Sequence, residues 1–548
     1  MDIRKAIDKG NLATGVIFLL LLWLTYYIYS LGSGGAFLFD DFNNLSPLGQ
    51  YENLGFWDNF WLFLLEGHSG PTGRPISLAS FYLNDTHWPS QAVGFIHTNI
   101  LIHLLNGALV FWFSLQLSKI LHLEDKKKAL FALITTAFWL LNPMQTTTVL
   151  YIVQRMTELS ATFMLTGFLF YLYGRKQLSD SKPKGYLTLF LGVGLSLLFA
   201  ILSKENGILL VAFILVIEFF LLQPLNNKTP KGYYFWFIPA IIIPFIAMII
   251  YLGVHINPDG FSHRNFTFTE RLLTEPRVLF EYIHQILLPN MSSITIFHDD
   301  FIISKSLLNP ITTVPALVGI AILVILLFYL RKKAPIISFA IAWFFAGHLI
   351  ESTVIPLELY FEHRNYLPSY GLFFALVWYA FKYLPNYKKT IIVIACSLLV
   401  FNTLIVWQNA KLWGTPLELA MNWYKTHPSS ERARRTYQSI SYDNGIKPIL
   451  IKTTKHRPKN RSIFYTASVM FDLSAACLSQ TISTEMLDRS IKEIKNNLIS
   501  TSTASSLKSK LKFPLVLLIV PMPLPTKPIL TDSMGASVSP LTMVAAIT

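Results

Sequence analysis

The chain has 548 residues, of which 53% are hydrophobic and 14% are charged, and its mean hydropathy is +0.46. This composition excludes an ordinary soluble globular protein and predicts an all-α integral membrane protein that crosses the bilayer many times. The formal net charge of +14 does not indicate a nucleic-acid partner, because the Lys and Arg residues lie mostly between hydrophobic segments instead of forming one basic face. The two cysteines are far apart and indicate neither a disulfide framework nor a metal site.

Eleven segments are predicted to be transmembrane helices, since a helix needs about 20 mostly apolar residues to cross a bilayer. The first segment lacks a small-residue cleavage site, so we expect it to be retained and not removed as a signal peptide. The predicted spans cover residues 12–31, 95–117, 128–145, 157–174, 186–203, 207–223, 234–254, 311–330, 335–353, 367–383 and 389–407.

The loops between these spans alternate between basic and cation-poor. Basic loops, such as those with Lys126–Lys128 and Arg331–Lys333, are predicted to face the cytoplasm together with the N-terminus, by the positive-inside rule. The loops of the other face carry few cations, and residues 32–94 contain only Arg74. With eleven spans, the region after residue 407 is predicted to lie outside, on the same face as the cation-poor loops.

Several shorter elements are predicted on this outer face. Trp57–Leu65 is too short to span and rich in aromatic residues, which predicts a helix lying in the membrane interface. Further helices are predicted at 269–288, 417–424, 430–441, 466–478 and 484–499. The predicted domains are a transmembrane domain at 1–408, a helical region on the outer face at 409–512 and a poorly ordered tail at 513–548, which is rich in Pro, Ser and Thr.

Two adjacent carboxylates, Asp40 and Asp41, follow the first span in a loop that is aromatic and apolar. Neighbouring residues on an extended segment point opposite ways, so we expect one carboxylate to face a substrate while the other anchors the loop. If both share a site, their repulsion raises one pKa toward the range of a general base. A solvated pair at a helix end is the alternative, which the apolar loop disfavours. Asp41 is the first candidate for the base, and Asp40 is the second.

Four cations at the outer ends of spans form a second candidate group, each on a different loop. A helical bundle can bring such residues together around an anionic lipid phosphate, with Arg as a planar fork and Lys as a point charge. For each cation, snorkelling to the interface or pairing with a nearby carboxylate is the alternative. The group is Arg74, Arg155, Lys204 and Arg364, and the polar residues expected to support it are Glu205, Glu362, His363 and Tyr366.

A second acidic pair, Asp299-Asp300, follows His298 in another outer loop. We expect a structural role for it, because no ligand spacing supports a metal site there. No cofactor is evident, and a divalent metal ion has no motif in its favour. The chain also lacks a glycine-rich phosphate loop and a nucleophile elbow, so a nucleotide-driven reaction on the cytoplasmic side has no support.

Short motifs follow one another in the outer loops. They are Phe39-Asp40-Asp41, Gly73-Arg74-Pro75-Ile76, Ser80–Asn84, Asn142–Thr146, Tyr151–Arg155, Leu202–Asn206 and Phe361–Leu367. In combination they resemble the polytopic glycosyltransferases of the C-type fold (GT-C), and in particular the bacterial relatives of the transmembrane, tetratricopeptide-repeat O-mannosyltransferases, which include pilin glycosyltransferases. The resemblance covers residues 10–445. Within the C-terminal region, only residues 428–444 suggest the beginning of a tetratricopeptide repeat.

This resemblance implies an inverting transfer of a sugar from a polyprenyl-phosphate carrier to a hydroxyl group of a protein, such as a pilin Ser or Thr. It also implies that the outer face, with the helical region at 409–512, is the periplasmic side of a bacterial cytoplasmic (inner) membrane. The acidic residue of the first loop, matched by Asp40 or Asp41, would take the proton from the acceptor hydroxyl. The cations would hold the charge that develops on the leaving phosphate. The implied partners are the lipid-linked donor, the protein acceptor and membrane lipid.

Alternatives remain open at this stage. Transfer to lipid A or to a polysaccharide uses the same chemistry, and so does a polymerase or ligase that joins lipid-linked oligosaccharides. A lipid or solute transporter or flippase is the alternative from another class. Transporters place ionisable groups near the membrane midplane and often contain inverted repeats. The predicted spans hold few such groups and show no repeat, which favours chemistry at the outer face.

Overall fold

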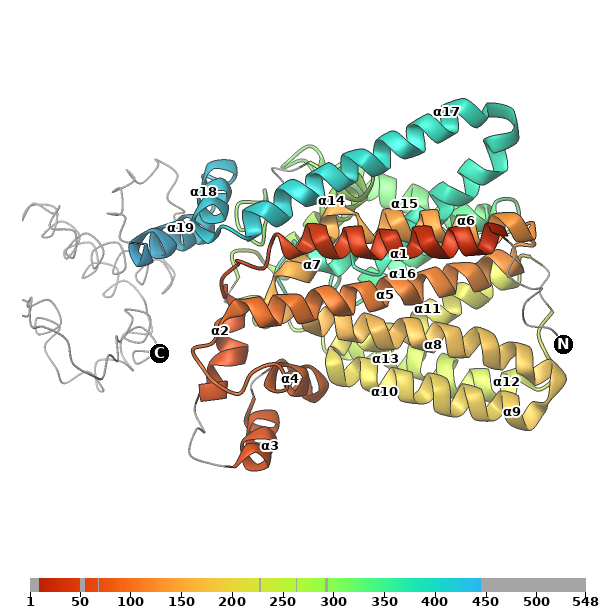
Figure 1. Ribbon diagram of the computed structural model, residues 1–548, viewed down its shortest axis with the longest axis horizontal. Helices are drawn as coiled ribbons and strands as arrows, with labels where there is room; N and C mark the ends of the chain where they lie inside the picture. Colours follow the sequence, from red (N-terminus) through yellow and green to blue (C-terminus); the bar gives the residue numbers. More distant parts are fainter. Residues whose placement is uncertain are drawn as a thin grey trace, which may run out of the picture. The chain divides into compact units, whose positions relative to one another are not determined.

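The computed structural model describes residues 9–49, 55–67, 69–225, 228–262, 264–290 and 294–444. These residues form a bundle of long helices with shorter helices at its ends, and they contain no β-strand (Figure 1). The predicted all-α class is therefore confirmed for this part of the chain. The helices predicted at 466–478 and 484–499, and the predicted tail at 513–548, lie outside the described residues.

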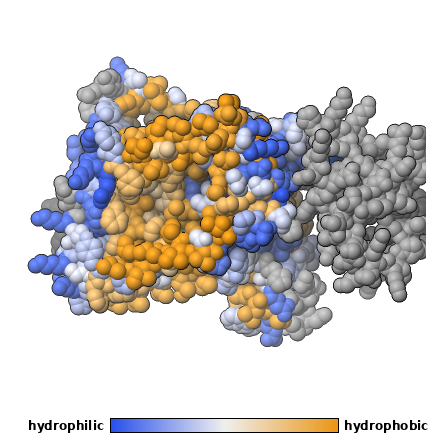
Figure 2. Space-filling view, turned by 180° about the vertical axis from the view of Figure 1, so that it is seen from behind, coloured by the Kyte–Doolittle hydropathy of each residue, from blue (hydrophilic) through white to orange (hydrophobic). Residues whose placement is uncertain are grey.

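Each of the eleven predicted spans overlaps a helix for most of its length, and the long apolar helices indicate a multi-pass membrane protein. Within the described residues, six helical stretches are long and apolar enough to cross a bilayer, and the count of eleven stays a prediction. Figure 2 shows an apolar belt with hydrophilic residues gathered on both sides of it. The six stretches are Ala13–Ser30, Ala92–Ile120, Lys182–Ser203, Glu205–Leu222, Tyr233–Val254 and Lys389–Trp413.

The first half of the bundle is built around α5 (Ala92–Ile120), which contacts three other long helices. These are α1 (Lys9–Ser30), α6 (Asp125–Leu140) and α8 (Arg155–Asp180). Short turns η3 (Pro143–Gln145), α7 (Thr146–Leu150) and η4 (Ile152–Gln154) join α6 to α8. These turns matter for the site, because they bring the chain from α6 back beneath the loop that follows α1.

Three further stretches each combine α-helix with a π-helical part. The first is α9 (Lys182–Leu187), η5 (Thr188–Val193) and α10 (Gly194–Ser203). The second is η6 (Glu205–Leu209), α11 (Leu210–Val216) and η7 (Ile217–Leu222), and the third is α12 (Tyr233–Phe237), η8 (Ile238–Ile242) and α13 (Ile243–Val254). A tight turn at Lys204 joins α10 to η6, between the spans predicted at 186–203 and 207–223.

The remaining helices confirm several predicted elements. Helix α14 (Phe268–Leu287) starts at a capping box made by Thr267 and Glu270, and it matches the helix predicted at 269–288. Helices α15 (Thr313–Tyr329) and α16 (Pro335–His348) are apolar, and η11 (Glu362–Asn365) follows them. Helices α18 (Pro416–Thr426) and α19 (Glu431–Asp443) match the helices predicted at 417–424 and 430–441.

Helix α17 (Pro368–Trp413) holds the last two predicted spans. A straight helix of 46 residues would be roughly 69 Å long, but Figure 1 shows this segment folding back on itself. Its far end meets the end of α1, where a Cβ atom on Gly34 would lie 2.6 Å from the carbonyl oxygen of Gly414. Only glycine tolerates such an approach. The first and last long helices therefore end against each other.

Three short helices stand between α1 and α5 at one end of the bundle, which we call the α2 end (Figure 1). They are α2 (Asp40–Leu45), α3 (Phe56–Glu66) and α4 (Pro75–Tyr82). Helix α3 packs on α4 through the rings of Phe56, Phe60 and Phe63 around Tyr82, with centroids 5.2 to 5.9 Å apart. Two tryptophans of α3 stay exposed, Trp57 at 66% and Trp61 at 57%.

We expect these two tryptophans to lie in the membrane interface, where an apolar ring with a polar N–H is most stable. In liposomes, brominated lipids should quench less of the total tryptophan fluorescence in a Trp57→Phe/Trp61→Phe variant than in the wild type. Trp423→Phe is the control, because Trp423 is buried in α18. Equal quenching of the wild type and the double variant would show that α3 stands away from the lipid.

Candidate functional site

A polar cavity of about 240 Å³ opens at the α2 end. It receives side chains from the start of α2, from the loop before α4, from the η4 turn and from the turn between α10 and η6. Its lining residues are Asp40, Asn43, Asn44, Gly70, Arg74, Val153, Gln154, Met156 and Lys204. Three predicted site residues from three separate outer segments, namely Asp40, Arg74 and Lys204, thus share one cavity.

The two aspartates begin α2, so the prediction that they lie on an extended segment is wrong. The chain turns here because the Asp41 N–H donates to the Leu38 carbonyl (2.8 Å) while the Asp41 Oδ2 accepts the Leu38 N–H (2.9 Å). The Asp41 Oδ1 accepts the Val153 N–H (2.7 Å), and the side chain is fully buried. Successive helical side chains point about 100° apart, and Asp40 lines the cavity. One carboxylate anchors the loop and the other faces the cavity, but the one that faces the cavity is Asp40, which the sequence ranked second.

The surroundings of Asp40 suit a proton acceptor. Burial raises its pKa above the ordinary value, and the guanidinium of Arg432 opposes this most, followed by Tyr151. Burial also raises the pKa of Asp41, against the hydrogen bonds from the backbone of Leu38 and Val153. A carboxylate whose pKa lies above the usual range accepts a proton more readily. Asp40 combines this property with access to the cavity.

Arg74 and Lys204 both have protein partners and still line the cavity. Arg74 donates from Nε and Nη2 to the Glu205 Oε2 (3.0 and 2.7 Å), while its Nη1 meets the thioether sulfur of Met156 (3.2 Å), a weak acceptor. The Lys204 Nζ donates to the Thr157 hydroxyl (2.9 Å). Burial lowers the pKa of Lys204, and a nearby Glu351 carboxylate, 3.4 Å from Nζ, opposes this. Both cations thus bring a basic side chain to the wall of the cavity.

The backbone on two sides of the cavity is strained. Phe39, next to Asp40, has φ 39°, and Arg74 has φ 47°. Residues other than glycine seldom adopt positive φ, and such conformations cost on the order of 1–3 kcal/mol and gather at functional sites. The packing around the cavity therefore fixes Phe39 and Arg74 where they are.

Arg155 lies outside the cavity and holds the chain together. Its guanidinium is fully buried and donates to four neutral acceptors. These are the side-chain oxygens of Asn99 and Asn84 (both 2.7 Å) and the carbonyl oxygens of Ser80 (2.9 Å) and Phe95 (2.8 Å). Arg155 thereby ties α8 to α4 and α5. Because these bonds use most of its N–H donors, the Arg155 guanidinium has few donors available for a phosphate.

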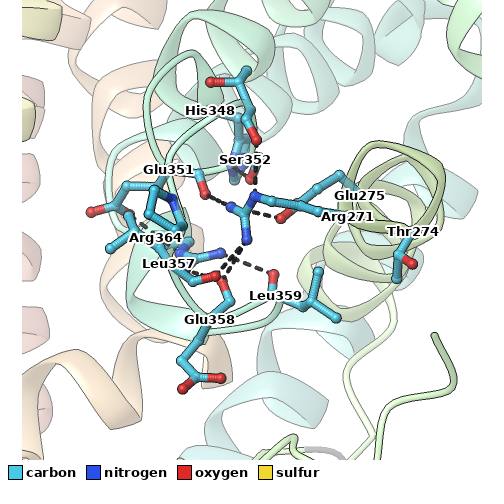
Figure 3. Close-up of polar contacts among 12 residues, drawn as sticks. Arg271, Thr274, Glu275, His348, Glu351, Ser352, Leu357, Glu358, Leu359 and Arg364 are labelled. Atoms are coloured by element: carbon cyan, nitrogen blue, oxygen red, sulfur yellow. Dashed lines mark hydrogen bonds and ion pairs between the residues drawn. The ribbon is translucent and has the colours of Figure 1, made fainter. Parts of the chain in front are cut away.

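Arg364 is also buried, in the loop between α16 and α17. It donates to the carbonyl oxygens of Leu359 (2.9 Å) and Glu358 (2.6 Å) and lies 3.5 Å from a carboxylate oxygen of Glu351. Figure 3 shows a second arginine, Arg271, pointing from α14 into the same loop. Sequence reasoning missed Arg271, although its spacing of four residues from its ion-pair partner Glu275 is a helical signal. Of the four predicted cations, two line the cavity and two fix loops around it.

The four predicted supporting residues have different positions. Glu205 accepts from Arg74, as described, and Glu362 accepts from the His298 Nε2 (2.6 Å). The Tyr366 hydroxyl bonds to His103 (2.8 Å) inside the bundle. His363 lines a second, narrow space of about 20 Å³, which has room for about one water molecule. Burial, followed by the charges of Lys204 and Arg364, holds the pKa of His363 well below its usual range, so it is neutral.

The predicted spans contain more buried charge than the sequence reasoning allowed. Glu158 is fully buried in α8, one turn after Arg155. Arg175 and Glu218 form a buried ion pair at 2.9 Å, which the Tyr171 hydroxyl joins by donating to Glu218 (2.5 Å). Interhelical hydrogen bonds of this kind stabilise helix packing in membranes. They give α8 and η7 a polar contact away from the α2 end.

No group of three or more His, Cys, Asp or Glu side chains that could hold a metal ion occurs within the described residues. In comparisons with protein-family models, with curated proteins and with solved structures, the chain matches none of them. The candidate site therefore rests on its own geometry and on the sequence motifs that supply its residues.

Proposed function

We propose that this chain is an inverting glycosyltransferase that moves a sugar from a polyprenyl-phosphate carrier to an acceptor hydroxyl on the outer face of a bacterial cytoplasmic membrane. The observation that carries the proposal is that Asp40 shares one polar cavity with Arg74 and Lys204. A hydroxyl is a weak nucleophile and needs a positioned base, and a leaving phosphate needs preorganised cations. The motifs that resemble GT-C enzymes contain all three residues.

In the proposed step, the Asp40 carboxylate accepts the proton of the acceptor hydroxyl. The hydroxyl oxygen attacks the anomeric carbon of the sugar from the side opposite the phosphate, so the new glycosidic bond forms as the carbon–oxygen bond to the phosphate breaks. The configuration at that carbon is inverted, and the lipid phosphate leaves with the electron pair. Arg74 and Lys204 stabilise the charge that it gains.

The proposed orientation follows from the charged residues at the two ends of the bundle. Basic segments such as Lys126–Lys128 lie at the start of α6, and Lys182 and Lys184 lie in α9, at the end opposite α2 (Figure 1). The positive-inside rule puts that end in the cytoplasm and the cavity outside. Outside the cell a membrane-bound donor replaces nucleotide sugars. We propose a protein hydroxyl, such as a pilin Ser or Thr, as the acceptor; lipid A and polysaccharide are the other acceptors for the same chemistry.

The test compares surface proteins, lipids and polysaccharides from cells with and without this gene by mass spectrometry. Loss of one sugar mass from a Ser or Thr of a surface protein would support the proposal and identify donor sugar and acceptor together. If the sugar is lost from lipid A or from a polysaccharide instead, the proposed chemistry stands but the acceptor is not a protein. Unchanged sugar masses in all three fractions would contradict the proposed activity.

Donor affinity should depend on the two cations that line the cavity. We expect Arg74→Gln or Lys204→Gln to weaken binding of the lipid-phosphate sugar by about 10-fold or more, because a charge-assisted hydrogen bond contributes about 1.5–3 kcal/mol. Binding to protein in nanodiscs measures this directly. Lys305→Gln is the matched control, since Lys305 is an exposed cation of an outer loop that does not line the cavity. If both cavity variants bind the donor with wild-type affinity, Arg74 and Lys204 do not take part in donor binding.

A further inference from the structure

Helices α18 and α19 are fixed at the α2 end by the acidic pair Asp299-Asp300. The Asp299 carboxylate accepts from the Ser430 hydroxyl and from the backbone N–H of Glu431 (3.0 Å), so it caps the start of α19. The Asp300 carboxylate bonds to the His427 Nδ1 (3.0 Å), in the turn between the two helices. These contacts agree with the structural role predicted for the pair, and they determine where α19 lies.

This docking brings one side chain of α19 to the loop that carries Asp40. The Arg432 guanidinium lies over the Phe39 ring, 5.4 Å from its centroid, and donates to the Glu358 Oε1 (2.7 Å). The ring of Phe297, from the same loop as Asp299, also contacts Phe39, with centroids 6.3 Å apart. Phe39 is the residue with φ 39° that immediately precedes Asp40. The strained residue is thus held by groups that come from the C-terminal helices and from the loop that docks them.

We propose that Arg432 is a positioning residue of the site: its guanidinium, which lies over the Phe39 ring, holds Phe39 in its strained conformation and places a positive charge near the adjoining Asp40 carboxylate. The proposal rests on the function proposed above, since that function makes Asp40 the base. It also extends the site, because it adds a residue from beyond the last predicted span. The C-terminal helical pair then acts in the reaction and is not only an appendage of the membrane domain.

Asp40 has several charged or titratable neighbours, and Arg432 has the largest effect among the cations. Against the burial that raises the pKa of Asp40, Arg432 is the first group to lower it; Tyr151 and Arg74 lower it less, and Glu358 raises it. Removing the charge of Arg432 should therefore raise the pKa of Asp40. The groups around Asp40 are Asp41 in α2, Arg74 before α4, Tyr151 before η4, Lys204 before η6, Glu358 before η11 and Arg432 in α19.

The experiment measures the transfer rate against pH for wild-type protein and for Arg432→Gln and Arg432→Lys in nanodiscs. The rate should rise with pH as Asp40 loses its proton, so a higher pKa moves this rise to higher pH. We expect Arg432→Gln to move it by about one pH unit, which is about a 10-fold lower rate on the acidic side, with recovery at high pH. Arg432→Lys keeps the charge and should stay near the wild-type profile.

Arg435→Gln is the matched control, because Arg435 is an arginine of the same helix that pairs with Glu431 (2.5 Å). Its pH profile should equal that of the wild type. If Arg432→Gln lowers the rate by the same factor at every pH, Arg432 has a merely structural role and the inference is overturned. If that variant does not fold, Asp300→Asn tests the same point by loosening α19, and an unmoved profile there overturns it as well. Asp40→Asn is measured in parallel. Full activity of that variant would contradict the proposed function, whereas an unmoved pH profile of the Arg432 variant alone would contradict only the role proposed for Arg432.

Discussion

Asparagine in place of Asp40 is expected to lower the rate of sugar transfer by about 10²- to 10⁴-fold, the usual contribution of a positioned general base. The substitution keeps the size and shape of the side chain and removes its ability to take a proton. The protein should stay folded, because the Asp40 side chain lines the cavity and the Asp40 backbone N–H keeps its hydrogen bond to the Tyr151 hydroxyl (2.8 Å). The amide oxygen of an asparagine can still accept from that hydroxyl, as the carboxylate does. Single-turnover transfer from a lipid-phosphate sugar, in nanodiscs, measures the loss.

Asp41→Asn is the informative companion, since it should affect stability first. Both Asp41 oxygens accept backbone N–H groups, from Leu38 and Val153. An asparagine must turn its NH₂ group toward one of these donors, which leaves a buried donor unsatisfied and costs about 1–3 kcal/mol. Full activity of Asp40→Asn would rule out Asp40 as the base. Loss of activity in Asp41→Asn at unchanged thermal stability would return the role to Asp41.

Replacing Arg155 by alanine should lower the free energy of unfolding by about 3 to 5 kcal/mol, because each hydrogen bond of a charged group contributes about 1.5–3 kcal/mol and the contributions of several do not add in full. The change removes all four hydrogen bonds of the guanidinium, and with them the link that it makes from α8 to α4 and α5. Arg155→Lys should also destabilise the protein, because an ammonium group cannot reproduce the planar fork. Thermal unfolding in detergent, followed by circular dichroism, measures both effects.

Arg74→Gln provides the contrast to Arg155→Ala. Arg74 and Glu205 form a partly exposed ion pair, and such pairs contribute about 0–1 kcal/mol to stability. We therefore expect Arg74→Gln to change donor affinity with little change in melting temperature, and Arg155→Ala to do the reverse. An Arg155→Ala protein with wild-type stability and weakened donor binding would restore the phosphate-binding role that the sequence suggested for Arg155.

Helix positions could be predicted because the signals are local. A run of apolar residues, or a helical period such as that of residues 269–288, depends on neighbours within a few turns, and the corresponding helix α14 starts and ends within one residue of that prediction. The interfacial character of α3 stays a prediction of the same kind, although its helix is present. The α17 segment could be predicted only in part from local signals. The spans predicted at 367–383 and 389–407 lie almost wholly within it, but the way in which it folds back depends on contacts with distant helices.

The site could be predicted only as a group of residues on the right loops. The sequence placed carboxylates and cations at the α2 end, but their hydrogen-bond partners decide which of them point into the cavity. The hydrogen bond from the Val153 N–H keeps the Asp41 side chain out of the cavity, and hydrogen bonds to Asn84 and Asn99 do the same for Arg155. These partners lie far away in the chain. No sequence signal singled out Arg432, because only the docking of α19 brings it to Phe39.

The meeting of the first and last long helices, at Gly34 and Gly414, has a consequence for biosynthesis. Asp40 leaves the ribosome among the first residues, whereas Arg432 follows only after every long helix of the bundle has been made. The nascent chain would therefore carry its base long before the charge that tunes it arrives. Premature termination between α17 and α19 would leave an inserted protein whose Asp40 lacks the neighbouring charge of Arg432, and under the proposal above we expect such a chain to transfer sugar more slowly on the acidic side of its pH profile.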